Sequence, residues 1–132
     1  MKKVAFICYG NACRSQMAEG LSRKYGDGLY QAYSAGTNPL GRVPSEVYEV
    51  MKKRGIDISD QYSKGLGDIP LDDMDFVITM GNCSASSICP AHFAGDKIDW
   101  YIPDPYGETM TDFEHVCRII EERIKEFIRI YF

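Results

Sequence analysis

The sequence predicts an α/β fold in which helices cover both faces of a parallel sheet. Two nearly continuous apolar runs, at residues 3–8 and 74–80, are typical of strands that are buried on both faces. Segments with helical spacing of apolar residues alternate with the predicted strands, and this alternation implies right-handed crossovers and parallel pairing. In such folds the ligand binds beyond the carboxyl ends of the strands, at the loops that lead into helices.

The first part of the chain follows the order strand, turn, helix, strand. After the first strand comes a polar turn, and apolar side chains then repeat at helical spacing through residues 15–25. Gly26 can end this helix. Residues 29–35 alternate weakly between apolar and polar, so we expect a second strand there, closed by Gly36.

The rest of the chain predicts two more helices and two more strands, of which the third strand is the apolar run at residues 74–80. Pro44 stands at a good first-turn position for a helix that has a basic end and is followed by Gly55. Residues 56–70 are polar and rich in turn formers, and a weak fourth strand is expected at residues 97–102. The last segment predicts a long amphipathic helix. Its apolar stripe contains Phe113, Val116, Cys117, Ile120, Ile124, Phe127, Ile128 and Tyr131.

Length and charge exclude several classes of protein. A chain of 132 residues can bury one substantial core and is too short for two ordinary domains, so we expect a single domain over residues 1–132. The formal net charge of −4 argues against a protein that mainly neutralises nucleic-acid phosphates. We therefore expect no nucleic-acid partner.

We also expect a cytoplasmic protein without a membrane partner. No run approaches the roughly 20 apolar residues that are needed to cross a bilayer. The basic start at residues 1–3 is followed by only five apolar residues, and no cleavage-site pattern comes after them. Five cysteines are an odd number for a secreted disulfide scaffold, and in a reducing compartment cysteines are more often catalytic, metal-binding or buried.

Residues 8–15 carry the pattern that points to chemistry. This loop joins the first predicted strand to the first predicted helix, so its amides can converge on one point above the positive end of the helix and attract an anion there. The converging amides belong to Tyr9, Gly10, Asn11, Ala12, Cys13 and Arg14. The same field favours the thiolate of Cys8, and the thiolate is the competent nucleophile.

Two further side chains complete this predicted site. Arg14 offers a planar fork of donors that can hold two oxygens of a tetrahedral oxyanion. Ser15 can donate a hydrogen bond to the Cys8 thiolate and stabilise it as a leaving group. The spacing of Cys8 and Arg14 alone is a loose pattern, but the strand before it and the helix after it supply the geometry that the chemistry needs.

The loop also carries a family resemblance. Residues 7–19 resemble the signature of the low-molecular-weight tyrosine phosphatase superfamily, which includes thioredoxin-coupled arsenate reductases. The resemblance continues through residues 34–37, 55–59, 76–80 and 104–105. It implies a three-layer α/β/α fold with a four-stranded parallel sheet, and it makes Asp104 the general acid. On the residues alone Asp104 is a turn residue between two prolines, so only the resemblance selects this carboxyl.

Two branches of the superfamily remain open, and they differ in how the covalent intermediate on Cys8 is resolved. Water resolves it in a phosphatase. In a reductase a second cysteine attacks Cys8 and releases arsenite, a third takes over the disulfide, and thioredoxin reduces that pair. Cys83 and Cys89 resemble the cysteine pair of the reductases. They follow the third predicted strand, on a Ser- and Gly-containing segment whose flexibility could bring a thiol toward Cys8.

Single residues favour one branch or the other. Gln16 resembles the reductases, because the phosphatases usually have Pro at that position. The reductases place the first cysteine of the pair directly after the strand, whereas Gly81 and Asn82 intervene here. Tyr106 resembles the tyrosine with which phosphatases line the pocket for an aryl ester, and it also fits a half-buried loop aromatic.

We therefore hypothesise an arsenate reductase in which Cys8 attacks arsenate, Cys83 attacks Cys8 and Cys89 attacks Cys83, with recycling by thioredoxin. The alternative is a low-molecular-weight protein tyrosine phosphatase that hydrolyses phosphotyrosine, a phosphate monoester, through a phosphocysteine on Cys8. An alternative of another class is an anion- or zinc-binding module without turnover, with Cys83, Cys89 and His92 as zinc ligands.

The resemblance also bears on a bound cation. Asn11 resembles the loop-bracing asparagine of the family, and Glu19 and Ser34 match positions that help a reductase loop to bind a potassium ion. On its own, Glu19 is typical of a solvated helical carboxylate. Apart from this potassium ion, we expect no tightly bound cofactor and no required metal.

Two cysteines have no assigned chemistry. Cys117 lies on the apolar stripe of the terminal helix and is expected in the core. Cys13 lies in the loop, where it either forms a protective disulfide with Cys8 or packs beneath the loop.

Overall fold

The computed structural model describes residues 1–81 and 83–132, and within them the chain forms four strands and four α-helices. The strands are β1 (Lys2–Cys8), β2 (Tyr30–Gly36), β3 (Phe76–Thr79) and β4 (Asp96–Asp99). The helices are α1 (Arg14–Tyr25), α2 (Ser45–Lys53), α3 (Ala85–Ile88) and α4 (Met110–Tyr131). Two 3-10 turns are η1 (Leu66–Asp68) and η2 (Leu71–Asp73).

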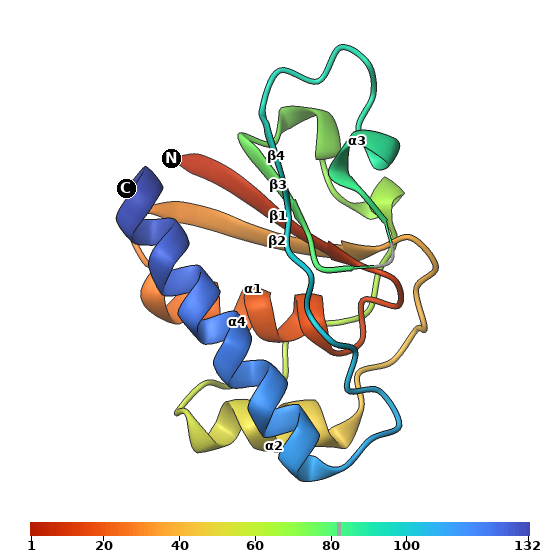
Figure 1. Cartoon of the computed structure of the whole chain (residues 1–132), viewed down its shortest axis with the longest axis vertical. Helices are drawn as coiled ribbons and strands as arrows, with labels where there is room; N and C mark the ends of the chain where they lie inside the picture. Colours follow the sequence, from red (N-terminus) through yellow and green to blue (C-terminus); the bar gives the residue numbers. More distant parts are fainter. Residues whose placement is uncertain (82) are drawn as a thin grey trace.

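The strands form one parallel sheet in the order β2, β1, β3, β4 (Figure 1). The register places Cys8 of β1 opposite Gly36 of β2, and Ile7 opposite Thr79 of β3. The carboxyl ends of these three strands therefore meet at one edge of the sheet. The predicted four-stranded parallel sheet is confirmed, and β1 is its central strand.

β1 is buried on both faces because its side chains alternate between two cores. Val4 and Phe6 belong to a large core that includes side chains from α1, α2 and α4. Ala5 and Ile7 belong to a smaller core that includes Ala85 of α3. All four β1 residues are fully buried, which explains the continuous apolar run in the sequence.

Helices cover the two faces of the sheet unequally. In Figure 1, α1, α2 and α4 lie together on one side of the sheet, and α3 lies on the other side. The second face is closed by this single helical turn and by partly buried side chains of η1 and η2, such as Leu66 and Leu71. The three-layer architecture is confirmed, with a thin second layer.

The predicted strands and the three longer helices are all present, whereas α3 has no counterpart among the predicted elements. The segment after β3, expected to be flexible, contains this helical turn. Ser84 caps it by accepting a hydrogen bond from the Ser87 amide at 3.2 Å. One turn is too short to show a helical period in the sequence.

The terminal helix α4 begins at a capping box. The Thr109 hydroxyl accepts a hydrogen bond from the Asp112 amide at 3.2 Å, and the Asp112 carboxylate accepts one from the Thr109 amide at 3.1 Å. Cys117 lies fully buried on the inner face of α4, as expected. Burial raises the pKa of its thiol to about 11, so Cys117 stays protonated in the core.

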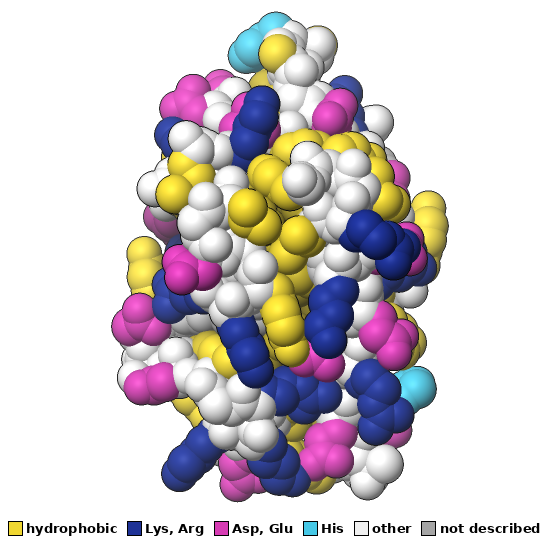
Figure 2. Space-filling model, turned by 90° about the vertical axis from the view of Figure 1, so that its left-hand side faces the viewer, with side chains coloured by type: hydrophobic (Ala, Val, Ile, Leu, Met, Phe, Trp, Pro, Cys, Tyr) yellow, Lys and Arg dark blue, Asp and Glu magenta, His cyan; other side chains and the backbone are white. Residues whose placement is uncertain are grey.

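The surface carries charges of both signs. Figure 2 shows lysine and arginine side chains interspersed with aspartate and glutamate on one face, with hydrophobic side chains in a band between them. Within the described part of the chain, none of the helices has the length and apolar character that crossing a membrane requires.

The capping box yields a stability prediction. Thr109→Ala removes the acceptor for the Asp112 amide, so we expect it to lower the free energy of unfolding by about 1 kcal/mol, measured by urea denaturation. Thr111→Ala is the matched control, because Thr111 is an exposed threonine of the first turn of the same helix. Equal unfolding midpoints for the two variants would contradict a capping role for Thr109.

Candidate active site

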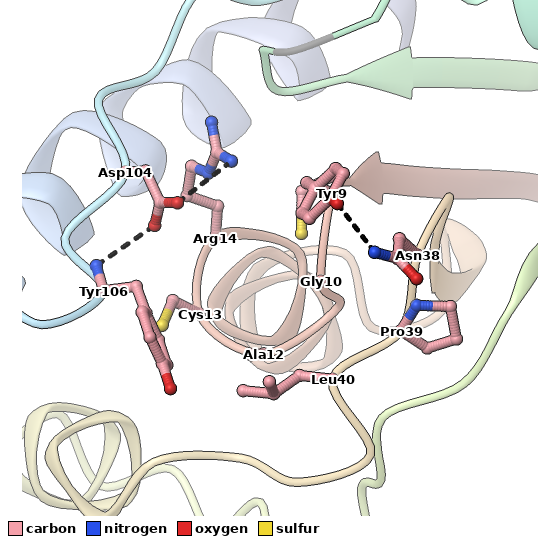
Figure 3. A pocket seen from close by; sticks show the side chains of 11 residues that line it. Tyr9, Gly10, Ala12, Cys13, Arg14, Asn38, Pro39, Leu40, Asp104 and Tyr106 are labelled. Carbon is pink, nitrogen blue, oxygen red and sulfur yellow. Dashed lines mark hydrogen bonds and ion pairs between the residues drawn. The ribbon is translucent and has the colours of Figure 1, made fainter.

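A pocket lies over the loop between β1 and α1, at the carboxyl edge of the sheet (Figure 3). Its volume is about 270 Å³. Its lining comprises Cys8, Tyr9, Gly10, Ala12, Cys13, Arg14, Asn38, Pro39, Leu40, Asp104 and Tyr106. The structure thus brings most of the predicted site residues to one place, although they come from three separate segments of the chain.

The carbonyl oxygens of the loop are bonded by the segments that surround it. Those of Cys8, Tyr9 and Gly10 accept hydrogen bonds of 2.8 to 3.1 Å from backbone amides of residues 37–40. The Ser63 hydroxyl donates a further bond to the Gly10 carbonyl at 3.0 Å. Because the carbonyls are held on the outer side, the N–H groups of the loop are left for the pocket, which is the arrangement that an anion needs.

A glycine allows this close packing of backbones. A Cβ atom at Gly36 would lie 2.7 Å from the Tyr9 carbonyl oxygen and 2.8 Å from the Asn11 amide nitrogen. Such distances exclude any side chain at Gly36 without movement of the loop. The sequence predicts Gly36 only as the end of a strand, so its role beside the loop is a finding of the structure.

The positive end of α1 lies beneath the loop. Its N-cap residue, Cys13, makes no side-chain capping bond, and the described first-turn residues include no acid. The first amides of a helix have no partner within the helix, and its dipole favours negative charge at this end. The first turn of α1 is therefore suited to an oxyanion.

Cys8 is buried and contacts a hydroxyl. Its sulfur lies 2.9 Å from the Ser15 oxygen, and that oxygen accepts a hydrogen bond from the Asn11 side-chain amide at 2.7 Å. Because the Asn11 amide group supplies the donor, the Ser15 proton is free to point at the Cys8 sulfur. This geometry is the one required for Ser15 to stabilise a Cys8 thiolate.

Asn11 adopts a positive φ of 46°, which asparagine tolerates better than most residues. Its side-chain oxygen accepts bonds from the Gln16 side chain and the Lys64 backbone amide, both at 2.9 Å. Asn11 is fully buried, so these contacts fix the loop from the inside. The structure therefore gives Asn11 a bracing position.

Arg14 lines the pocket, and one of its guanidinium nitrogens is already hydrogen-bonded to the backbone. Its Nη1 donates to the carbonyl oxygens of Met80 and Ile102, at 2.8 and 3.0 Å. The predicted fork for an oxyanion is therefore the edge formed by Nε and Nη2. The side chain is buried, and a Cβ at Gly81 would lie 2.7 Å from Nη1. Gly81 is one of the two residues that separate the third strand from Cys83. It is needed here because a side chain at this position would collide with Arg14.

Asp104 enters the pocket from the loop before α4. One of its oxygens lies 3.6 Å from Arg14 Nη2, and the other accepts a hydrogen bond from the Tyr106 amide at 3.1 Å (Figure 3). About half of its side chain is exposed. The position suits a carboxyl that delivers a proton to a departing oxygen, the role that only the family resemblance assigns to it.

Cys13 lines the pocket, but its environment opposes ionisation. Burial, with the nearby Asp104 and Cys8, raises the pKa of this thiol to about 12. In the structure all five cysteines are free thiols, and Cys13 packs in the large core beneath the loop.

Cys83 and Cys89 flank α3 on the other face of the sheet and are both half-buried. The pKa of Cys83 is raised by burial, by Asp99 and by Cys8, and it is lowered by Arg14. Cys83 follows β3, whose last residue Thr79 pairs with Ile7, and it packs against the small core that contains Ile7. Burial also raises the pKa of Cys89, which Lys97 lowers in part.

The zinc alternative finds no support. Among the described residues, which include Cys83, Cys89 and His92, no three His, Cys, Asp or Glu side chains are grouped as metal ligands. His92 is largely exposed and lies 3.9 Å from Asp72.

The residues expected at a potassium ion lie close together in the structure. The Ser34 hydroxyl donates to the Glu19 carboxylate at 2.5 Å, and Asn11 lies nearby through the backbone of Lys64. Glu19 is buried and not solvated. The Lys64 side chain also enters this group, a contact that no local sequence pattern predicts.

Known proteins similar to this chain include reductases and phosphatases. An arsenate reductase of Brevibacillus brevis is 39% identical over 130 residues, covering 96% of this chain and 93% of its own. A glutaredoxin arsenate reductase of Synechocystis is 36% identical, covering 97% of each chain.

Two solved structures superpose on nearly the whole chain. One is an arsenate reductase in the reduced state, with a TM-score of 0.85, 35% identity and 98% coverage of each chain. The other is a low molecular weight protein tyrosine phosphatase from T. tengcongensis, with a TM-score of 0.84, 30% identity and coverage of 98% of this chain and 99% of its own.

Residues 3–130 match the family described as low molecular weight phosphotyrosine protein phosphatase. The match spans the loop, Arg14 and Asp104. The superposed structures agree with this match over nearly the whole chain. The chain belongs to the low molecular weight phosphotyrosine protein phosphatase family.

Proposed function

We propose that this protein is an arsenate reductase that uses Cys8, Cys83 and Cys89 in succession. The observation that carries the proposal is the place of Cys83, which follows β3 at the edge of the sheet where β1 ends in Cys8, and which packs against the small core that contains Ile7. Cys89 follows at the other end of the single turn of α3. The similarity to arsenate reductases along the whole chain supports the same function.

The first step forms a bond between Cys8 and arsenic. The Cys8 thiolate attacks arsenate held by the loop amides and Arg14, and an oxygen departs as water with a proton from Asp104. The arsenic is still As(V) at this stage. Arg14 and the amides of the loop neutralise the charge that develops on the arsenate oxygens.

The second and third steps move electrons from thiols to arsenic. The Cys83 thiolate attacks the Cys8 sulfur, and the S–As bond breaks with its electron pair left on arsenic, which is released as arsenite, As(III). Cys89 then attacks Cys83, and Cys8 departs as a thiolate stabilised by Ser15. A dithiol protein of the thioredoxin or glutaredoxin class reduces the Cys83–Cys89 disulfide and returns the two electrons.

A phosphatase is the second candidate, and the walls of the pocket favour it. Tyr9 and Tyr106 lie on opposite sides of the loop, and Leu40 also lines the pocket (Figure 3). All three are substantially exposed and could hold an aryl ring. In that case water would resolve a phosphocysteine on Cys8, and Cys83 and Cys89 would have no part in turnover.

Single-turnover chemistry separates the two candidates. Without any reductant, the wild type is expected to yield one arsenite per chain, and Cys83→Ser none. Cys89→Ser is expected to yield one arsenite and to stop at a Cys8–Cys83 disulfide, which peptide mass spectrometry detects. Aryl phosphate hydrolysis by the same variants serves as the test that the loop is intact.

Cys117→Ala is the matched control, because Cys117 is a cysteine of the core and lies outside the pocket. It should form arsenite like the wild type. If the wild type forms no arsenite while it hydrolyses aryl phosphates rapidly, and Cys83→Ser does the same, the protein is a phosphatase.

The raised pKa of Cys83 predicts a pH dependence. Its ordinary value is 9.0, so below pH 9 only a minor fraction of Cys83 is thiolate, and this fraction grows as the pH rises. At saturating arsenate, the rate of single-turnover arsenite formation should therefore increase roughly tenfold per pH unit in this range. A rate that does not change with pH would show that the attack by Cys83 does not limit the reaction.

The general acid can be tested with two leaving groups. Asp104→Asn should slow hydrolysis of phenyl phosphate by about 10²-fold, because this leaving group needs a proton, and should slow p-nitrophenyl phosphate much less. Glu108→Gln, at an exposed carboxyl of the same loop, should affect neither. Equal losses on both substrates would mean that Asp104 acts only through its contact with Arg14.

A further inference from the structure

A lysine side chain lies inside the fold beside the loop. The ammonium of Lys64 is 3.0 Å from the Tyr62 carbonyl oxygen, 3.3 Å from the Ser34 hydroxyl and 3.6 Å from a carboxylate oxygen of Glu19. Only 10% of the Lys64 side chain is exposed. An ammonium has three N–H donors, and here three oxygens surround it.

One of these oxygens belongs to the buried carboxylate of Glu19, and its negative charge requires a cation nearby. Ser34 is fully buried and Glu19 is 5% exposed, and a buried carboxylate is costly unless a cation compensates it. Arg23 reaches the second carboxylate oxygen of Glu19 at 2.9 Å, but from the surface side, with 44% of its side chain exposed. The inner oxygen of Glu19 accepts a hydrogen bond from Ser34, and the positive charge beside it is that of Lys64.

The backbone of Lys64 is fastened to the loop that carries Cys8. Its amide donates to the Asn11 side chain at 2.9 Å, and its carbonyl accepts from the Gly36 amide at 2.9 Å. Asn11 in turn bonds Ser15, which contacts Cys8. The position of the ammonium and the shape of the loop are thus linked through one residue.

We propose that the Lys64 ammonium is a built-in cation that occupies the place of a bound potassium ion. Carboxylate, hydroxyl and carbonyl oxygens are the ligands that hard metal cations prefer, and the family resemblance leads one to expect potassium beside Glu19 and Ser34. The ammonium uses the same oxygens. It braces the loop permanently, so the protein needs no potassium, and Lys64 is a positioning residue for the anion site.

The test is whether free potassium can replace the lysine. Lys64→Met keeps an unbranched stem and removes the charge. In tetramethylammonium chloride its thermal unfolding midpoint should lie about 5 °C or more below that of the wild type. About 0.1 M KCl, at the same ionic strength, should restore at least half of this loss, whereas the wild type should unfold at one temperature in both salts.

The matched control is Lys52→Met, at an exposed lysine of α2, which should show no difference between the two salts. A wild type stabilised specifically by potassium would overturn the proposal, and so would a Lys64→Met variant that responds equally to both salts. If Lys64→Met does not fold in either salt, Lys64→Gln takes its place under the same criterion. Failure of both variants to fold in KCl also overturns the proposal.

A second measurement examines the positioning role. Inorganic phosphate is the probe, and its dissociation constant is measured by calorimetry. Lys64→Met in tetramethylammonium chloride should bind phosphate about threefold or more weakly than the wild type, and KCl should reverse the loss. An unchanged dissociation constant would overturn the link between Lys64 and the loop, because a purely structural lysine would not alter phosphate affinity.

Discussion

The loop between β1 and α1 can offer its N–H groups to an anion only because its carbonyl oxygens are bonded elsewhere. A short backbone loop carries as many acceptors as donors, and the acceptors repel an oxyanion unless they face away from it. Residues 37–40 and Ser63 take up the carbonyls from outside. The positive end of α1 then reinforces the field of the amides. The anion site is therefore a property of three chain segments, although the residues that would touch the anion are nearly contiguous.

The buried charged side chains beside the loop are also held by partners from other segments of the chain. Arg14 is buried beside two backbone carbonyls and Asp104, and Glu19 is buried beside Lys64 and Arg23. Each of these two buried ions thus has a partner of opposite sign, whose attraction offsets part of the cost of removing the ion from water. Arg14 and Asp104 line the pocket, whereas Glu19 and Lys64 are not among its lining residues.

The parts of the site that could be predicted are those that a local pattern encodes. The apolar run of β1, the helical period of α1 and the spacing of Cys8, Arg14 and Ser15 lie within one short segment, so sequence alone suffices. Asp104 reaches Arg14 from a distant loop, and only the family resemblance selects it. The roles of Lys64, Ser63 and Gly36 depend on how β2 and the segment after α2 pack against the loop. Such packing leaves no periodic signal, and neither does the single turn of α3.

The parallel bridge between Gly36 and Gly65 has a consequence for the newly made chain. It joins the end of β2 to the residue after Lys64, and the same segment bonds the loop through the Ser63 hydroxyl and the Lys64 amide. A nascent chain that has emerged only as far as α1 already contains Cys8 and Arg14, but not the segments that organise them. The anion site as the structure shows it thus needs the chain at least as far as residue 65.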